Sequence, residues 1–161
     1  MAEKTNASRI LERMGVNFSL VEYKVDPDHL DAIHVASELG EDIETVFKTL
    51  VLHGDKNGHF VCVIQGDKEV DLKKAAKISG NKKVAMIPMK ELLPLTGYVR
   101  GGCTAIGMKK NFPVFLDSRA LDKESIYISA GKRGLQIKLN PGDYIKATNA
   151  TTGDLITNPE E

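Results

Sequence analysis

The chain has 161 residues, a length that fits one domain with a substantial core. Lysines and arginines number 22, and aspartates and glutamates also number 22, so the composition excludes the overall basic charge of a dedicated nucleic-acid-binding protein. Two cysteines exclude a disulfide framework, the lack of a long apolar run excludes a membrane span, and residues 1–12 are too polar for a signal peptide. We therefore expect a cytoplasmic protein with reduced thiols.

The first part of the chain predicts two helices and a strand. Apolar residues at helical spacing predict a helix over 5–14, and 17–25 is typical of a strand. Asp31 is a favourable N-cap for a helix that ends before Gly40. One more helical turn is expected over 42–47.

The sequence Asp55-Lys56-Asn57-Gly58 predicts the tip of a β-hairpin. Asn-Gly is the strongest short-range signal for a hairpin turn. Apolar, β-branched segments at 48–52 and 59–64 flank it on both sides. We expect these two segments to pair as antiparallel strands.

The second half of the chain adds a capped helix and a second hairpin. Asp71 and Gly80 are the expected caps of a helix over 71–79. Strands at 125–130 and 135–139 alternate well and flank Gly131-Lys132-Arg133-Gly134. The remaining predicted elements are a strand at 84–87, helical turns at 88–95, a strand at 113–116, and a short helix or turn that begins at residue 140.

These elements predict the fold class. Hairpins mixed with helices, without a repeat or a linker, indicate one α+β domain over 1–161. The sheet is expected to be mixed and mostly antiparallel, and to be flanked by helices. Its short strands, punctuated by glycine, favour a curved sheet that approaches a partial barrel.

The segment from Gly97 to Gly107, here called the glycine loop, contains four glycines in eleven residues. Glycine lets a backbone adopt positive φ or approach another molecule closely. Successive N–H groups in such a loop can point toward an anion or a developing oxyanion. We place the chemistry of the protein in this loop; the alternative is a surface connection without a chemical role.

The stretch from Gly102 to Lys109 approaches a phosphate-binding P-loop but does not match it. That motif requires Lys directly after its second Gly, followed by Ser or Thr. Met108 stands in the Lys position here. The sequence therefore disfavours nucleotide hydrolysis.

The histidines do not form a metal-binding pattern. His29 and His34 are five residues apart, off the helical i, i+4 step, and His53 and His59 flank the predicted hairpin turn. We expect no metal site and no cofactor.

Two side chains, Cys103 and Lys48, each allow a chemical and a purely structural interpretation. Cys103 lies near Arg100, which would stabilise a nucleophilic thiolate, but a small side chain that lines a pocket is the favoured interpretation. Cys62 lies in an apolar strand and is expected in the core. Lys48 opens an apolar strand and either donates to an anion or ester oxygen in a cavity or extends its ammonium group to water.

Five motifs occur in order along the chain: Val46-Phe47-Lys48-Thr49-Leu50, Asp71-Leu72-Lys73-Lys74, Gly97-Tyr98-Val99-Arg100-Gly101-Gly102-Cys103, Gly107-Met108-Lys109-Lys110 and Gly131-Lys132-Arg133-Gly134-Leu135. Together they resemble the YbaK/EbsC family, the free-standing relatives of the editing domain inserted in bacterial prolyl-tRNA synthetases. The resemblance extends over residues 4–148.

The resemblance implies a trans-editing aminoacyl-tRNA deacylase. Such proteins remove Cys from mischarged tRNA(Pro), and also act on Cys-tRNA(Cys). The thiol of the substrate attacks its own ester, so the protein supplies no nucleophile. Catalysis then rests on proximity and on oxyanion stabilisation. The implied partners are the acceptor end of an aminoacyl-tRNA and prolyl-tRNA synthetase, with no membrane.

The resemblance also implies roles for individual residues. Lys48 would orient the ester or the terminal ribose, with Thr49 beside it, and Tyr23 would be a pocket tyrosine. The substrate loop would comprise Gly101, Gly102, Cys103, Thr104 and Gly107. Contacts with tRNA phosphates would come from Lys109, Lys110, Lys132 and Arg133.

Two departures from the family pattern leave the activity open. Ala105 stands where the family commonly carries Pro, and Gln136 stands where it often carries Asp. An amide cannot act as a base or hold a cation by charge. Two alternatives therefore stand beside the Cys-tRNA(Pro) hypothesis: a deacylase for another small residue, such as Ala-tRNA(Pro), and a non-catalytic module that binds tRNA or a synthetase.

Overall fold

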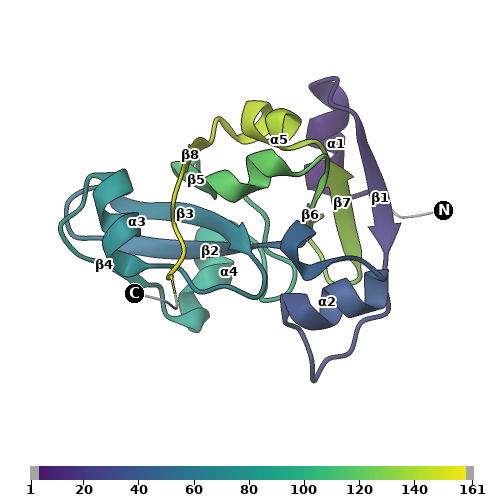
Figure 1. Cartoon of the computed structure of the whole chain (residues 1–161), viewed down its shortest axis with the longest axis horizontal. Coiled ribbons are helices and arrows are strands. Elements are labelled where there is room, and N and C mark those ends of the chain that lie inside the picture. Colours follow the sequence, from purple (N-terminus) through teal and green to yellow (C-terminus); the bar gives the residue numbers. More distant parts are fainter. Residues whose placement is uncertain (1–3, 159–161) are drawn as a thin grey trace.

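A computed structural model describes residues 4–158 as two β-sheets with helices around them (Figure 1). The three-stranded sheet has the order β1 (Phe18–Glu22), β7 (Leu135–Leu139), β6 (Ile126–Ser129), and all its pairs are antiparallel. The five-stranded sheet has the order β4 (Val84–Met86), β2 (Phe47–Gly54), β3 (Gly58–Gln65), β5 (Val114–Asp117), β8 (Thr151–Gly153). Its β3–β5 and β5–β8 pairs are parallel.

Five α-helices and three 3₁₀ turns surround these strands in the described part of the chain. The α-helices are α1 (Asn6–Arg13), α2 (Ala32–Leu39), α3 (Leu72–Ser79), α4 (Leu92–Thr96) and α5 (Pro141–Thr148). The 3₁₀ turns are η1 (Ile43–Thr45), η2 (Met89–Glu91) and η3 (Ser118–Asp122). Local caps fix several helix ends: Asp31 and Asp71 accept hydrogen bonds from the first turns of α2 and α3, and Gly40 and Gly80 end these helices with positive φ.

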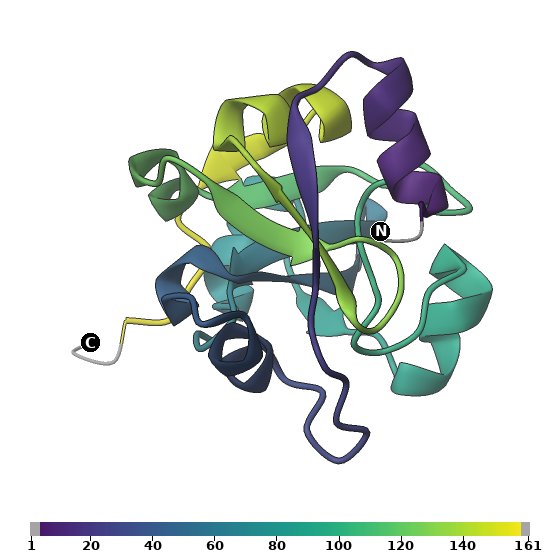
Figure 2. The same cartoon turned by 90° about the vertical axis from the view of Figure 1, so that its right-hand side faces the viewer.

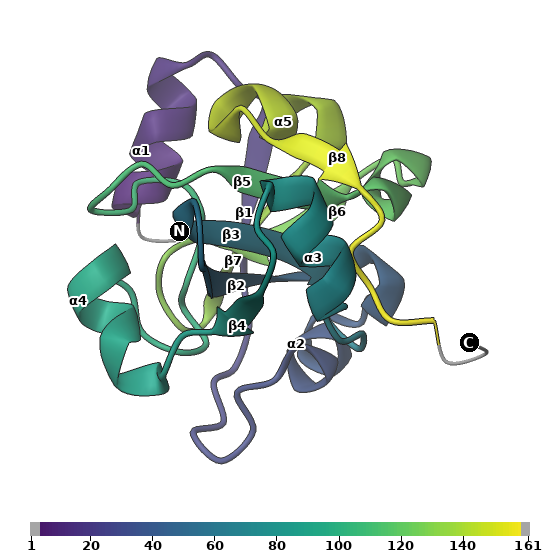
Figure 3. The same ribbon diagram turned by 90° about the vertical axis from the view of Figure 1, so that its left-hand side faces the viewer.

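The hydrophobic core has two principal parts, one on each face of the five-stranded sheet. The larger part fills the space between the two sheets and includes Val51, Leu116 and Ile137. The second part lies between the five-stranded sheet and α3, and includes Phe60 and Cys62. Figure 2 shows β1 and β7 in front of the five-stranded sheet, and Figure 3 shows α3 across its opposite face.

The predicted α+β class and mixed strand pairing are confirmed. The curved sheet is divided into two sheets that do not close into a barrel. A parallel bridge between Val46 and Tyr127 joins them at one point. Within residues 4–158, no helix is both long and apolar enough to cross a membrane.

The main differences from the predicted elements are local. The helical turn expected over 42–47 is only the η1 turn, and Phe47 instead begins β2, where it pairs with Gln65. Pairing across the hairpin outweighs the local helical signal at this residue. The helical turns expected over 88–95 are η2 and α4, and Pro94 falls in the first turn of α4, where its missing N–H removes no intrahelical bond.

Candidate active site

A cavity of about 310 Å³ opens along the edge of β2. Because β4 pairs with β2 only from Leu52 to Gly54, the preceding part of that edge has no strand beside it. The start of α2, the end of β4, α4 and the glycine loop supply the other walls. The cavity therefore combines segments that are far apart in the sequence, and Figure 3 shows α2, β4 and α4 in the lower part of the molecule.

Lys48 lines the cavity from β2, together with Thr49. The side chain is half-buried, and it makes no hydrogen bond or ion pair within residues 4–158. Burial lowers the pKa of Lys48 below its usual value, while the carboxylates of Glu69, Asp67 and Asp31 act in the opposite direction from a distance. A partly desolvated ammonium group without a partner is suited to donate to an oxygen of a bound ligand.

The glycine loop contributes Arg100, Gly101 and Cys103 to the cavity wall. The Gly102 amide donates to the Val99 carbonyl oxygen at 2.9 Å. The amides of Gly101 and Cys103 donate to no group in the described part of the chain. Gly101 has φ +86°, a conformation that a side chain would strain. The loop thus presents unused N–H groups beside the cavity.

The glycine loop packs directly on the turn 131–134. A Cβ atom at Gly102 would approach the backbone of Lys132 to about 3.0 Å, and one at Gly131 would lie 3.0 Å from the Tyr98 ring. Tyr98 also donates its hydroxyl to the Ile106 carbonyl oxygen at 2.6 Å. These contacts bring two of the predicted motifs together and fix the course of the loop.

Cys103 is buried, with 9% of its surface exposed. Burial raises the pKa of its thiol to about 12, and a hydrogen bond with Thr96 opposes this only in part. The group is therefore a neutral thiol near pH 7, which is the state of a lining residue and not of an activated nucleophile.

Gln136 reaches the cavity from β7, next to Ser129 of β6. Its side chain is 5% exposed, and its Oε1 atom has no hydrogen-bond partner among the described residues. A buried acceptor without a donor costs about 1–3 kcal/mol. Such groups are uncommon and are found where a ligand or water completes the bond.

The other predicted site residues lie outside the cavity lining. Tyr23 packs near α2, and its amide donates to the Gly134 carbonyl oxygen at 3.0 Å. Thr104 is fully buried. A Cβ atom at Gly107 would contact Asn6 and Ile10 of α1. Gly102, between the lining residues Gly101 and Cys103, is not itself part of the lining. The structure does not test the roles of these four residues, which stay predictions.

The four predicted tRNA contacts form two separate pairs. Arg133 donates its Nε–H to the Arg100 carbonyl oxygen at 2.8 Å, so it and Lys132 adjoin the part of the glycine loop that borders the cavity. Lys109 lies over Gly97 at the start of the loop, and Lys110 is near His59 of β3. The two pairs therefore lie at different parts of the loop.

Several lining residues were not predicted as site residues from the sequence. Asp31 was recognised only as a helix cap, yet it also borders the cavity. Met86, Ile87 and Met89 supply an apolar wall that no motif marks. The described residues hold no group of three or more metal-ligating side chains.

Comparisons with known proteins identify relatives of the whole domain. The model of the aminoacyl-tRNA editing domain matches residues 26–147. EbsC of Enterococcus faecalis, provisionally named a Cys-tRNA(Pro)/Cys-tRNA(Cys) deacylase, is 48% identical over 155 residues, which cover 96% of this chain and 94% of that protein. A proline–tRNA ligase of Shouchella clausii is 28% identical over 127 residues, which cover 78% of this chain and 22% of the ligase.

Solved structures share the fold at lower identity. A protein provisionally described as a trans-editing enzyme for prolyl tRNA synthetase has a TM-score of 0.83 at 24% identity, with 98% of this chain and 100% of that chain covered. The hypothetical protein APE2540 has a TM-score of 0.86 at 22% identity, with 95% and 100% covered. At these sequence identities, the structural similarity shows a shared fold.

Proposed function

This chain belongs to the aminoacyl-tRNA editing domain family, and we propose that it removes cysteine from mischarged Cys-tRNA(Pro), and also from Cys-tRNA(Cys). The name and the 48% identity of the E. faecalis relative support this substrate. Prolyl-tRNA synthetase is the proposed partner, because a proline–tRNA ligase contains a segment similar to this domain.

The observation that carries the proposal is the composition of the cavity wall. An unpaired ammonium group, Lys48, and the unused amides of Gly101 and Cys103 border the same cavity. The volume of about 310 Å³ is at the lower end of small-molecule sites, which suits an aminoacyl ester. The cavity thus offers donors for an ester, and its one lining thiol is not activated.

In the proposed reaction the substrate's own thiol is the nucleophile. Its sulfur attacks the ester carbonyl carbon, the bond from that carbon to the ribose oxygen breaks, and the ribose oxygen leaves with the thiol proton. The products are uncharged tRNA and the cyclic thiolactone of cysteine. The amides of Gly101 and Cys103 stabilise the carbonyl oxygen as it gains charge, and Lys48 holds the ester. Binding the bent ester supplies a high effective thiol concentration.

A time course of deacylation tests this proposal. tRNA(Pro) charged with Cys is compared with the same tRNA charged with Ala, each with and without the protein, and the released product is identified by mass. We expect loss of Cys as the thiolactone and slow loss of Ala. Free cysteine as the first product, or loss of Ala at a similar rate, would indicate attack by water and a broader deacylase.

The experiment also separates catalysis from binding. An apolar pocket discriminates only modestly between side chains that differ by one small group, so a chemical requirement for the thiol is the sharper criterion. If tRNA is bound but neither amino acid is released, even with prolyl-tRNA synthetase present, the protein is a binding module.

A further inference from the structure

One surface of the molecule concentrates lysines, although the chain has no net charge. The segments 54–57 and 71–83 together contain six lysines and two aspartates. The structure places these segments side by side, because α3 and the residues after it pack against the β2–β3 turn. We call this surface the lysine junction; its lysines are Lys56, Lys73, Lys74, Lys77, Lys82 and Lys83.

Hydrogen bonds hold the lysine junction rigidly. The Oδ1 atom of Asp55 accepts from the amides of Lys82 and Lys83 at 2.9 and 3.1 Å. The Oδ1 atom of Asn81 accepts from the amides of Lys56 and Asn57 at 2.9 and 2.7 Å. The side chain of Asn81 also occupies the space that a Cβ atom at Gly54 would need. The backbone that carries these lysines is therefore preorganised.

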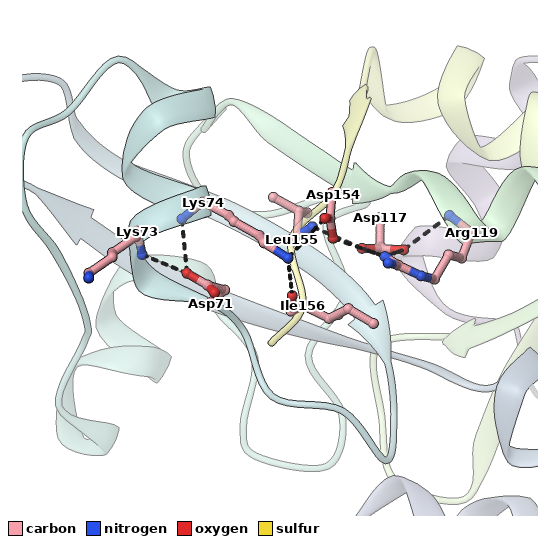
Figure 4. Close-up of polar contacts among 8 residues, drawn as sticks. All are labelled: Asp71, Lys73, Lys74, Asp117, Arg119, Asp154, Leu155 and Ile156. Carbon is pink, nitrogen blue, oxygen red and sulfur yellow. Dashed lines mark hydrogen bonds and ion pairs between the residues drawn. The ribbon is translucent and has the colours of Figure 1, made fainter. Parts of the chain in front are cut away.

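Most of the charge at the junction is not neutralised internally. Lys74 forms an ion pair with Asp154 at 2.9 Å and donates to the Ile156 carbonyl oxygen at 2.8 Å. Lys73 and Lys77 are one helical turn apart on α3 and make no ion pair with any described residue, and Figure 4 shows Lys73 pointing away from the Lys74 network. Both aspartates of the junction are engaged by backbone amides, Asp55 as above and Asp71 as the cap of α3.

We propose that the lysine junction binds the phosphate backbone of a tRNA acceptor stem. The proposal rests on the proposed function, because it assigns to the same substrate a second contact surface. Lysine is a flexible point charge suited to phosphates, and phosphate contacts position a nucleic acid without reading its sequence. Lysine is depleted in protein–protein interfaces, and Leu72 is the one exposed large apolar side chain in these segments, so an RNA backbone fits better than a protein.

The position of the junction relative to the cavity supports this assignment. β4 leads directly from Lys83 to Met86, and Met86 lines the cavity. Three residues of extended chain span about 10 Å. A backbone bound at the junction could therefore direct a single-stranded 3′ end along β4 into the cavity, and Figure 3 shows α3 and β4 on the same side of the molecule.

The test compares two double variants with the same change in charge. K73E/K77E alters the junction, and R13E/K146E alters positions on α1 and α5. Each protein is assayed on full-length Cys-tRNA(Pro) and on the cysteinyl ester of the trinucleotide CCA, which lacks the acceptor stem. Binding of uncharged tRNA(Pro) is measured against salt concentration.

We expect K73E/K77E to bind tRNA(Pro) about tenfold more weakly, with a salt slope reduced by roughly 1 for each phosphate that the variant no longer binds. Its activity on the short ester should equal that of the wild type, which also shows that the variant is folded. The R13E/K146E variant should match the wild type in every assay.

The outcomes separate this proposal from the proposed function. Equal tRNA binding by K73E/K77E and the wild type would overturn the lysine junction as an RNA surface, while deacylation of the short ester would still support the activity. A defect that appears only when prolyl-tRNA synthetase is present would overturn it too, and would assign the junction to an acidic protein surface instead. Failure of the wild type on both esters would refute the deacylase itself.

Discussion

Lys48 illustrates how a candidate functional residue can lower stability. Burial lowers its folded-state pKa below the unfolded value, so the fold disfavours the charged form. This cost is present in full at pH values below the folded pKa and disappears above the unfolded pKa. The carboxylates of Glu69, Asp67 and Asp31 offset this cost only in part, because no described residue forms an ion pair with the ammonium group.

Replacing Lys48 by methionine should therefore separate activity from stability. We expect Lys48→Met to lower the deacylation rate by about 100-fold or more, as for removal of a donor to a reacting oxygen. Its thermal midpoint should rise by about 2 °C, measured by calorimetry at pH 7. The control Lys24→Met, at an exposed lysine, should change neither quantity. A Lys48→Met protein with full activity would remove the proposed role.

Cys103 permits a second prediction at the scale of one side chain. Burial raises the pKa of its thiol to about 12, so the thiolate is scarce at neutral pH. We expect Cys103→Ala to deacylate Cys-tRNA(Pro) within about threefold of the wild-type rate, and we expect the wild-type thiol to resist alkylation at pH 7. A complete loss of activity in a folded Cys103→Ala protein would favour covalent catalysis.

The candidate site could be predicted from the sequence only where one short segment carries the signal. Lys48 and the glycine loop stand out by residue type and by family resemblance, and both border the cavity. Gln136 could be recognised as a departure from the family, but its unpaired Oε1 atom depends on how β7 lies against the cavity. Met86 and Met89 carry no signal, because the wall they form exists only after β4 has paired with β2.

At the scale of elements, the glycine loop depends on one aromatic side chain. Tyr98 donates to the Ile106 carbonyl oxygen at 2.6 Å and packs its ring over Gly131. The hydroxyl closes the loop on itself, and the ring attaches the loop to the turn 131–134. We therefore predict that Tyr98 positions the amides of Gly101 and Cys103.

Removing the Tyr98 hydroxyl should remove the hydrogen bond that closes the glycine loop, while the ring still fills its place against Gly131. We expect Tyr98→Phe to lose about 1 kcal/mol of unfolding free energy and to lower kcat about fivefold, with a smaller change in KM. The control is Tyr144→Phe, because the Tyr144 hydroxyl is buried without a hydrogen-bond partner among the described residues and its removal should not destabilise the protein. Unchanged kcat in Tyr98→Phe would limit its role to packing.

The elements themselves were predicted best where their ends are marked locally. Asp31, Asp71 and the Asn57-Gly58 turn act within a few residues, and the structure has the corresponding caps and hairpin. The strand β8 was not predicted, because three residues carry little pattern and pair only with the distant β5. The division into two sheets has the same cause, since β1 pairs with β7 more than 100 residues later.

At the scale of the whole molecule, a polar network attaches the C-terminal segment to the rest of the fold (Figure 4). The buried carboxylate of Asp117 accepts from Arg119 at 3.1 Å and from the Leu155 amide at 2.9 Å. Asp154 pairs with both Arg119 and Lys74, at 3.0 and 2.9 Å. The network connects β5, α3 and the residues after β8, and through Lys74 it also adjoins the lysine junction.

The network predicts a defined dependence of stability on pH. Hydrogen bonds from Lys74 and Arg119 lower the pKa of Asp154 below 3.8. The stabilisation is therefore complete above the unfolded pKa and is lost as pH falls through the lower, folded pKa. Because Asp154 is 48% exposed, we expect Asp154→Asn to lose only about 0.5–1 kcal/mol at pH 7, or about 1–4 °C in Tm. Thermal melts from pH 7 to pH 2 should show a difference in Tm between the wild type and Asp154→Asn that is constant above about pH 5 and vanishes at the acid end.

The control is Asp122→Asn, which removes no ion pair between described residues and should follow the wild type throughout. An Asp154→Asn difference in Tm that persists at pH 2 would show that packing, and not charge, holds the C-terminal segment.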